Sequence, residues 1–154
     1  MSPKVRPIPE GYATVTPYLI TSSAAGAIEV YAKAFGATEL MRFVDPKGRI
    51  GHAEIRIGDS RVMLADEFPD HGARSPRAFG GSPVSIHLYV EDVNAMAARA
   101  TAAGAKVIRP VQDQFYGDRS VTLEDPFGHT WHVATHVEDV SEEELKRRSA
   151  ALHG

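Results

Sequence analysis

The 154-residue chain contains no cysteine, which excludes a disulfide framework, a cysteine-based zinc site and a cysteine nucleophile. It has no excess of basic residues either, because its formal net charge is −3 with histidine neutral, so a surface for nucleic acid is not expected. No apolar run is long enough to cross a bilayer, and residues 1–12 lack the apolar centre of a signal peptide. We therefore expect a cytoplasmic protein whose partners include neither a membrane nor nucleic acid.

What the chain does contain is a core-forming composition and one pattern that occurs twice. Hydrophobic residues make up 43% and charged residues 24%, which suits one domain or two small halves. In residues 84–90 apolar and polar side chains alternate with period two, as in a half-buried strand. Asp92 can then cap a helix with one apolar face, and Gly104 ends it. The same succession occurs at residues 15–36, with Ser22 or Ser23 as the cap.

Each predicted helix is followed by three short predicted strands, so the order strand, helix, strand, strand, strand is repeated. In the first copy these strands are residues 39–44, 51–57 and 60–66, and in the second they are residues 106–111, 120–124 and 130–136. We predict five segments: an N-terminal arm (1–12), a first module (13–66), a turn-rich linker (67–82), a second module (83–137) and a peripheral C-terminal helix (138–154).

Three motifs make the repeat specific: Tyr-Val-Glu-Asp-Val at 89–93, Gly-Ala-Lys-Val at 104–107 and Asp-Pro-Phe-Gly-His-Thr-Trp at 125–131. With them, the chain resembles the vicinal oxygen chelate superfamily, which includes glyoxalase I, bleomycin-resistance proteins and extradiol dioxygenases. The stretches 51–59 and 114–119 resemble its uncharacterised glyoxalase-like subgroup. The resemblance implies an α+β fold of two βαβββ modules that form paired half-barrels, a ligand cavity in the cup between them, and a homodimer.

Strand alternation assigns side chains to the cup, because residues two apart share a face. We predict that a small-molecule ligand contacts two groups of residues, one on the strands and one near the rim. These residues are His52, Glu54, Ser85, His87 and His132 on the strands, and Phe115, Tyr116 and Arg119 near the rim. Glu54, His87 and His132 are the candidates for acid–base catalysis. Arg119 has a structural alternative, an ion pair with Asp118 or Glu124.

The resemblance also raises the question of a metal ion. Metal-binding members carry ligands on the first and last strands of each copy. By motif these positions fall on Ser85, His132, Leu64 and either Val15 or Thr16, so that Leu64 is the predicted equivalent of His132. Only His132 is a competent ligand, and we therefore predict no cofactor. The alternative is a displaced site for a divalent metal such as Zn, Ni or Fe, built from His52, Glu54, His87 and His132.

Three functional hypotheses follow. The first is a glyoxalase-like or bleomycin-resistance-like protein that binds a small molecule without the usual metal. The second is an enzyme, either a glyoxalase I-like lyase or isomerase or a dioxygenase relative, that uses the displaced metal or acid–base chemistry. The third is a structural module, favoured if the protein's own side chains fill the cup. Strand alternation predicts faces and not pocket shape, so the ligand's identity does not follow from the sequence.

Overall fold

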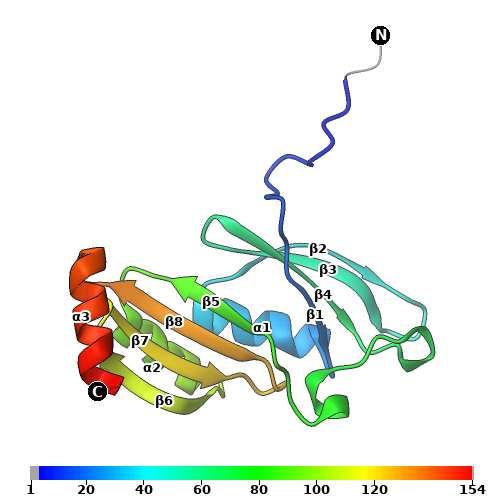
Figure 1. Ribbon diagram of the computed structural model, residues 1–154. Helices are drawn as coiled ribbons and strands as arrows, with labels where there is room; N and C mark the ends of the chain where they lie inside the picture. The colour runs from blue at the N-terminus through cyan, green and yellow to red at the C-terminus, as the bar shows by residue number, and fades with distance from the viewer. Residues whose placement is uncertain (1–3, 154) are drawn as a thin grey trace. The chain divides into compact units, whose positions relative to one another are not determined.

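The computed structural model describes residues 4–153, which form two compact units that divide after Gly80 (Figure 1). We call residues 4–80 the N-terminal module and residues 81–153 the C-terminal module. The division falls within the predicted linker, where two short 3₁₀ helices, η1 (Pro69–His71) and η2 (Pro76–Phe79), provide local structure.

The N-terminal module is one four-stranded sheet with one helix, α1, packed across a single face of it (Figure 1). The strand order is β1-β4-β3-β2; β1 and β4 are parallel and the other pairs are antiparallel. The elements are β1 (Tyr18–Thr21), α1 (Ala24–Phe35), β2 (Thr38–Val44), β3 (Ile50–Ile57) and β4 (Ser60–Asp66).

The C-terminal module repeats this arrangement. Its sheet has the order β5-β8-β7-β6, β5 and β8 are parallel, and α2 packs across β6, β7 and β8. The elements are β5 (Ser85–Tyr89), α2 (Val93–Ala102), β6 (Lys106–Asp113), β7 (Asp118–Glu124), β8 (Thr130–His136) and α3 (Glu142–His153). The α+β fold of two βαβββ modules predicted from the sequence is confirmed.

Local chemistry explains why the two helices begin where they do. The Ser23 hydroxyl accepts a hydrogen bond from the Gly26 amide at 3.1 Å, and the Asp92 carboxylate accepts one from the Ala95 amide at 3.0 Å. Gly36 ends α1 in the left-handed conformation that glycine adopts without a steric penalty. The apolar faces of both helices are buried: Ala27, Ile28, Tyr31 and Phe35 on α1, and Val93, Ala97 and Ala100 on α2.

Hydrogen bonds at the helix starts fix which residues of the two modules are equivalent. The first amide of α1, from Ala24, donates to Asp66 Oδ1 at 2.7 Å, and the first amide of α2, from Val93, donates to Thr135 Oγ1 at 2.9 Å. Asp66 therefore corresponds to Thr135. The ladders agree, because a register irregularity follows Glu39 in β2 and Val107 in β6.

This equivalence corrects the predicted superposition by one residue. Counting back from Asp66 and Thr135, His132 corresponds to Met63, and Leu64 corresponds to Val133. Leu64 is fully buried, as is Val133, so the predicted match of Leu64 to His132 is wrong. Ile20 likewise corresponds to Tyr89 and not to Leu88 or Val90. A slip of one residue matters because it moves every side chain of a strand to the opposite face.

Helix α3 lies at the periphery, as predicted. The Ser141 hydroxyl accepts a hydrogen bond from the Glu144 amide at 3.2 Å, which caps the helix, and no α3 residue is buried. Arg148 attaches the helix to the module by donating to the Phe115 carbonyl at 2.9 Å and pairing with Glu138 at 2.6 Å. None of the helices in residues 4–153 combines the length and apolar character that a membrane span requires.

Candidate functional site

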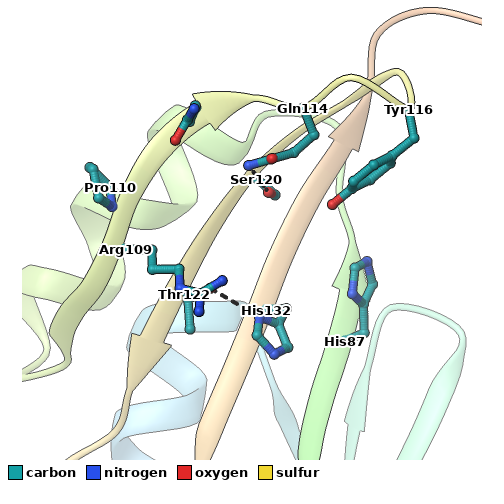
Figure 2. A pocket seen from close by; sticks show the side chains of 9 residues that line it. His87, Arg109, Pro110, Gln114, Tyr116, Ser120, Thr122 and His132 are labelled. Carbon is teal, nitrogen blue, oxygen red and sulfur yellow. Dashed lines mark hydrogen bonds between the residues drawn. The ribbon is translucent and has the colours of Figure 1, made fainter. Parts of the chain in front are cut away.

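Each sheet has one face covered by its helix and one that the helix leaves free, which we call the helix-free face. In the C-terminal module the helix-free face holds a cavity of about 360 Å³, a size typical of small-molecule sites. The cavity lies over β5, β8, β7 and β6, with the β6–β7 loop at one end (Figure 2). Its lining residues are His87, Arg109, Pro110, Gln112, Gln114, Tyr116, Ser120, Thr122 and His132.

The lining of this cavity is rich in hydrogen-bond donors and carries no carboxylate among the described residues. The only full positive charge is the Arg109 guanidinium. Within residues 4–153, the side chains of Arg109 and Gln112 and the Tyr116 hydroxyl have no hydrogen-bond or ion-pair partner, and the His87 imidazole makes ring contacts only. Polar groups left without partners on a concave surface are available to a ligand.

His132 is the most constrained of these groups. Its Nδ1 lies 3.0 Å from the hydroxyl of Thr122, its cross-strand neighbour on β7, so that its ring orientation is set (Figure 2). The His87 ring lies 6.2 Å away, centroid to centroid. Burial lowers the pKa of His132 below that of an ordinary histidine, and the nearby His87 and Arg109 lower it further. The lowered pKa favours the neutral imidazole of His132.

A buried carboxylate lies at the start of β7, next to the β6–β7 loop. Asp118 is 3% exposed and accepts hydrogen bonds from the Tyr89 hydroxyl and from His136 Nδ1, both at 2.8 Å. The bond to Asp118 raises the pKa of the Tyr89 phenol, so this hydroxyl stays protonated as a donor. The second nitrogen of His136 lies 2.7 Å from Asp139. This network ties β5, β7 and β8 together beside the β6–β7 loop.

The β6–β7 loop is shaped by a glycine that no other residue can replace. Gly117 has a φ of +99°, and a Cβ at this position would lie 2.1 Å from the Glu138 carbonyl oxygen. The Gly117 carbonyl in turn accepts the amides of Val137 and Glu138. Next to it, Tyr116 reaches the cavity while Gln114 bonds to Ser120 at 3.1 Å (Figure 2). The glycine thus places the tyrosine at the cavity's edge.

The helix-free face of the N-terminal module carries a different cluster. Glu54 on β3 accepts a hydrogen bond from the Tyr12 hydroxyl with one oxygen, and its other oxygen lies 2.8 Å from His52 Nε2. His52 Nδ1 lies 2.8 Å from the Tyr18 hydroxyl. The bond from Tyr12 lowers the pKa of Glu54, and His52 lowers it further. The Arg61 guanidinium lies over the Tyr12 ring, 4.8 Å from its centroid.

The predicted site residues are found in both modules. His87, His132 and Tyr116 line the cavity of the C-terminal module, and His52 and Glu54 bond to each other in the N-terminal module. Ser85 is exposed at the start of β5 and is not part of the cavity lining.

Two predicted rim residues face elsewhere. Phe115 lies in a shallow groove against α3, beside Leu145 and Ser149. Arg119 pairs with Asp113 across the β6–β7 ladder at 2.7 Å, which is an ion pair, though not with either predicted partner.

Sequence reasoning missed the lining residues that β6 contributes, Arg109, Pro110 and Gln112, and Gln114 of the loop that follows. The signal that points to them is cross-strand register. Arg109 is paired with Thr122, and Gln112 with Ser120, so the polar face of β7 continues onto β6. The irregularities between these pairs break the simple alternation along β6, and for this reason period-two counting does not find them.

The donor set does not fit a divalent metal within either module. A zinc site needs three or more converging protein ligands, and no group of three His, Asp or Glu side chains so arranged occurs in the described part of the chain. The cavity lining offers two imidazoles and no carboxylate. Met63, the N-terminal equivalent of His132, offers only a thioether.

Comparison with known proteins agrees with this fold. An uncharacterised protein of Mycobacterium bovis is 44% identical over 135 residues, which cover 86% of this chain and 89% of the relative. The crystal structure of TioX from Micromonospora sp. ML1 is similar with a TM-score of 0.64 and 26% identity, covering 81% of this chain and 99% of the other.

A glyoxalase/bleomycin resistance protein/dioxygenase from Nocardioides shares the fold, with a TM-score of 0.62 at 20% identity over 84% of this chain and 87% of the other. The family model described as Glyoxalase/Bleomycin resistance protein/Dioxygenase superfamily matches residues 12–133. The chain belongs to this superfamily.

Proposed function

We propose that this protein binds a small molecule with an anionic group in the cavity of its C-terminal module, and that it does so without a metal ion. The observation that carries the proposal is the set of donors without partners, Arg109, Gln112 and Tyr116, in a cavity with no carboxylate. Such a surface repels cations and leaves an arginine available for a carboxylate or phosphate group.

The neutral His132 contributes to selectivity in this proposal. Because its pKa is lowered, it presents one donor or one acceptor and not a second full charge. A ligand with one anionic end for Arg109 and a hydrogen-bonding or aromatic remainder for His132 and Tyr116 matches the lining. The volume of about 360 Å³ limits the ligand to a small molecule.

The test is a calorimetric titration with benzoate and its neutral analogue benzamide, in buffer containing EDTA. We expect benzoate to bind and benzamide to bind at least tenfold more weakly. In the variant Arg109→Gln, which keeps an amide donor and removes the charge, the affinity for benzoate should fall by tenfold or more, about 1.4 kcal/mol.

The matched control is Arg56→Gln. Arg56 is an exposed arginine in β3 of the N-terminal module, and its loss should leave benzoate binding unchanged. Equal losses in the two variants, or equal binding of benzoate and benzamide, would contradict the proposal. The titration is repeated without EDTA, and binding of benzoate that occurs only without EDTA would instead favour the displaced-metal alternative.

An enzyme is the second candidate, and the neutral His132 is the observation that favours it. A histidine whose Nδ1 donates to Thr122 would have a free Nε2 lone pair, which is what a general base needs. The two candidates are separated by incubating the protein with a ligand that binds and following the ligand by NMR in D₂O. Turnover or deuterium exchange that His132→Asn abolishes would make the protein an enzyme; an unchanged ligand supports binding alone.

A further inference from the structure

Tyr12 is the one residue of the described part of the arm that is not exposed. Residues 4–11 are exposed, whereas Tyr12 reaches β3 and β4 of the N-terminal module. Its hydroxyl donates to Glu54 Oε1, and its ring lies against the Arg61 guanidinium, with 4.8 Å between the guanidinium carbon and the ring centroid. Both halves of the phenol, the donor and the aromatic face, are therefore recognised.

The receptor for this phenol is held in place by its own hydrogen bonds. Glu54 uses its second oxygen for His52 at 2.8 Å, and His52 in turn lies 2.8 Å from the Tyr18 hydroxyl. A carboxylate can only accept, so His52 Nε2 donates to Glu54, and in the neutral tautomer this leaves His52 Nδ1 to accept from the Tyr18 hydroxyl. Burial raises the pKa of Tyr18, so its hydroxyl keeps its proton for this role. One acceptor, Glu54 Oε1, is left for a hydroxyl from outside the sheet.

The backbone of the arm is adapted to this contact. Gly11 has a φ of +84°, a conformation that favours glycine, and a Cβ there would lie 2.3 Å from Arg61 Nη2, so a larger residue would displace the guanidinium. The Tyr12 amide also closes a turn by donating to the Pro9 carbonyl at 3.1 Å. This turn therefore positions the Tyr12 side chain against Glu54.

We propose that Glu54, His52 and Arg61 form a binding site for a phenol, and that the protein's own Tyr12 fills this site until a phenol from outside displaces it. This site lies in the N-terminal module and does not depend on the anion site proposed above. The chemistry required of a ligand is an aromatic ring with one hydroxyl donor. A free small phenol and the tyrosine side chain of another polypeptide both supply it.

Competition with a tethered residue sets the expected affinities. A side chain linked by a short segment acts at an effective concentration in the millimolar range, so a free phenol must exceed that concentration to displace Tyr12. Removing the Tyr12 ring removes the competitor and raises the apparent affinity for a free phenol. This gain is the signature of an occupied site.

The experiment is a titration of ¹⁵N-labelled protein with p-cresol, followed by NMR, with toluene as the ring that lacks a hydroxyl. We expect Tyr12→Ala to bind p-cresol at least tenfold more tightly than the wild-type protein, and to bind toluene no better than the wild-type does. In the wild-type protein, saturating p-cresol should move the Gly11 and Tyr12 amide signals to random-coil positions. This second measurement needs no variant and so does not depend on how a variant folds.

Two further variants make the test specific. Tyr12→Ala combined with Glu54→Met should lose the gain, because the acceptor is gone. Tyr89→Ala is the matched control, since the Tyr89 hydroxyl also donates to a carboxylate, Asp118, in the other module. The proposal would be overturned if Tyr89→Ala gained as much affinity for p-cresol as Tyr12→Ala does, or if Tyr12→Ala gained as much affinity for toluene. It would also be overturned if Tyr12→Ala gained no affinity for p-cresol.

A second ligand distinguishes the two possible sources of the phenol, a free small molecule and a tyrosine of another polypeptide. N-acetyltyrosinamide, titrated into Tyr12→Ala, carries the backbone atoms that a tyrosine of another polypeptide would bring. Binding of p-cresol alone supports the site and identifies a free small phenol as its ligand. Binding of both compounds supports the site and extends it to tyrosine side chains.

Discussion

The two modules have the same strand order and the same helix position, yet their helix-free faces are opposite in character. In the N-terminal module Glu54 and His52 are joined in a chain of hydrogen bonds that begins at Tyr12 and ends at Tyr18. In the C-terminal module the equivalent of Glu54 is Thr122, which bonds to His132, and the side chains of Arg109, Gln112 and Tyr116 line a cavity without polar partners among the described residues. The same fold thus carries a cluster filled by Tyr12 in one module and an open cavity in the other, and the difference lies in the side chains.

The turns before β3 and β8 offer a second comparison, although they occupy different places in the two modules, because β3 corresponds to β7 and β8 corresponds to β4. Both follow the pattern Asp-Pro-x-Gly, and in both the Asp Oδ1 accepts two amides of the turn. The second oxygen of Asp45 pairs with the Arg49 side chain near the surface, whereas that of Asp125 accepts the buried Trp131 indole at 2.9 Å. The C-terminal module has therefore connected its turn to its core.

The largest effect is expected from Trp131→Ala. Trp131 is completely buried, and its loss should lower the free energy of unfolding by about 3–5 kcal/mol through the cavity it leaves, while Asp125 Oδ2 loses its indole donor. Its N-terminal equivalent is Val62, which faces Ile55 as Trp131 faces Leu123. Val62→Ala should cost about 1.5 kcal/mol, for two buried carbon atoms.

Urea unfolding followed by circular dichroism measures both variants, because Trp131 is the single tryptophan and fluorescence is lost with it. If the two variants lose equal amounts of unfolding free energy, then the indole of Trp131 is no more important to its module than Val62 is to the other.

A smaller effect, on binding and not on folding, is expected from Thr122→Glu, which gives the C-terminal module the carboxylate that Glu54 provides in the N-terminal one. The new charge would lie beside His132, its cross-strand neighbour, and would repel an anion. Affinity for benzoate should fall by at least tenfold, about 1.4 kcal/mol. Thr122→Gln, of the same size and neutral, should bind within threefold of the wild-type protein; if it falls as far as Thr122→Glu, shape and not charge is responsible.

The smallest effect is a dependence of stability on pH, in which two histidines of the C-terminal module act in opposite directions. The bond to Asp118, and then that to Asp139, raises the pKa of His136 above its unfolded value. The stabilisation it provides is therefore complete below about pH 6.5 and is lost as the pH rises through the folded pKa. For His132 the folded pKa is lowered, so folding opposes its protonation and stability falls as the pH drops below about 6.5.

Thermal unfolding between pH 5 and pH 8.5 distinguishes the contribution of His136 from that of His132. His136→Asn should flatten the decline on the alkaline side, and His132→Asn should flatten the decline on the acid side. Identical profiles for the wild-type protein and both variants would show that neither imidazole is linked to folding.

Much of the fold follows from the sequence because its signals are local. The caps at Ser23 and Asp92, the turns at Asp45 and Asp125, and period-two alternation in β3 and β7 each act within a few residues. The equivalence of Leu64 and His132 failed because strand register depends on pairing with β1 and β5, which are distant in sequence.

The candidate site was only partly predictable for a related reason. Alternation identified His87 and His132, which lie on regular strands. It did not identify Arg109, because β6 is irregular, or the direction of Phe115, because Gly117 and the Arg148 contact set the path of that loop. Tyr12 was missed because an arm with three prolines carries no periodic signal for where it docks.

The parallel pairing of β5 with β8 also has a kinetic consequence. β5 pairs with no other strand of its sheet, and β8 is the last strand of the module along the chain. During synthesis, the strand Ser85–Tyr89 therefore remains unpaired until Thr130–His136 has emerged from the ribosome. Contacts between such distant segments slow folding, because a long loop must close before they form. The β6–β7 and β7–β8 pairs join neighbours in sequence, but β5 can join the sheet only through β8, and the half-made chain exposes a strand edge that needs protection from other chains.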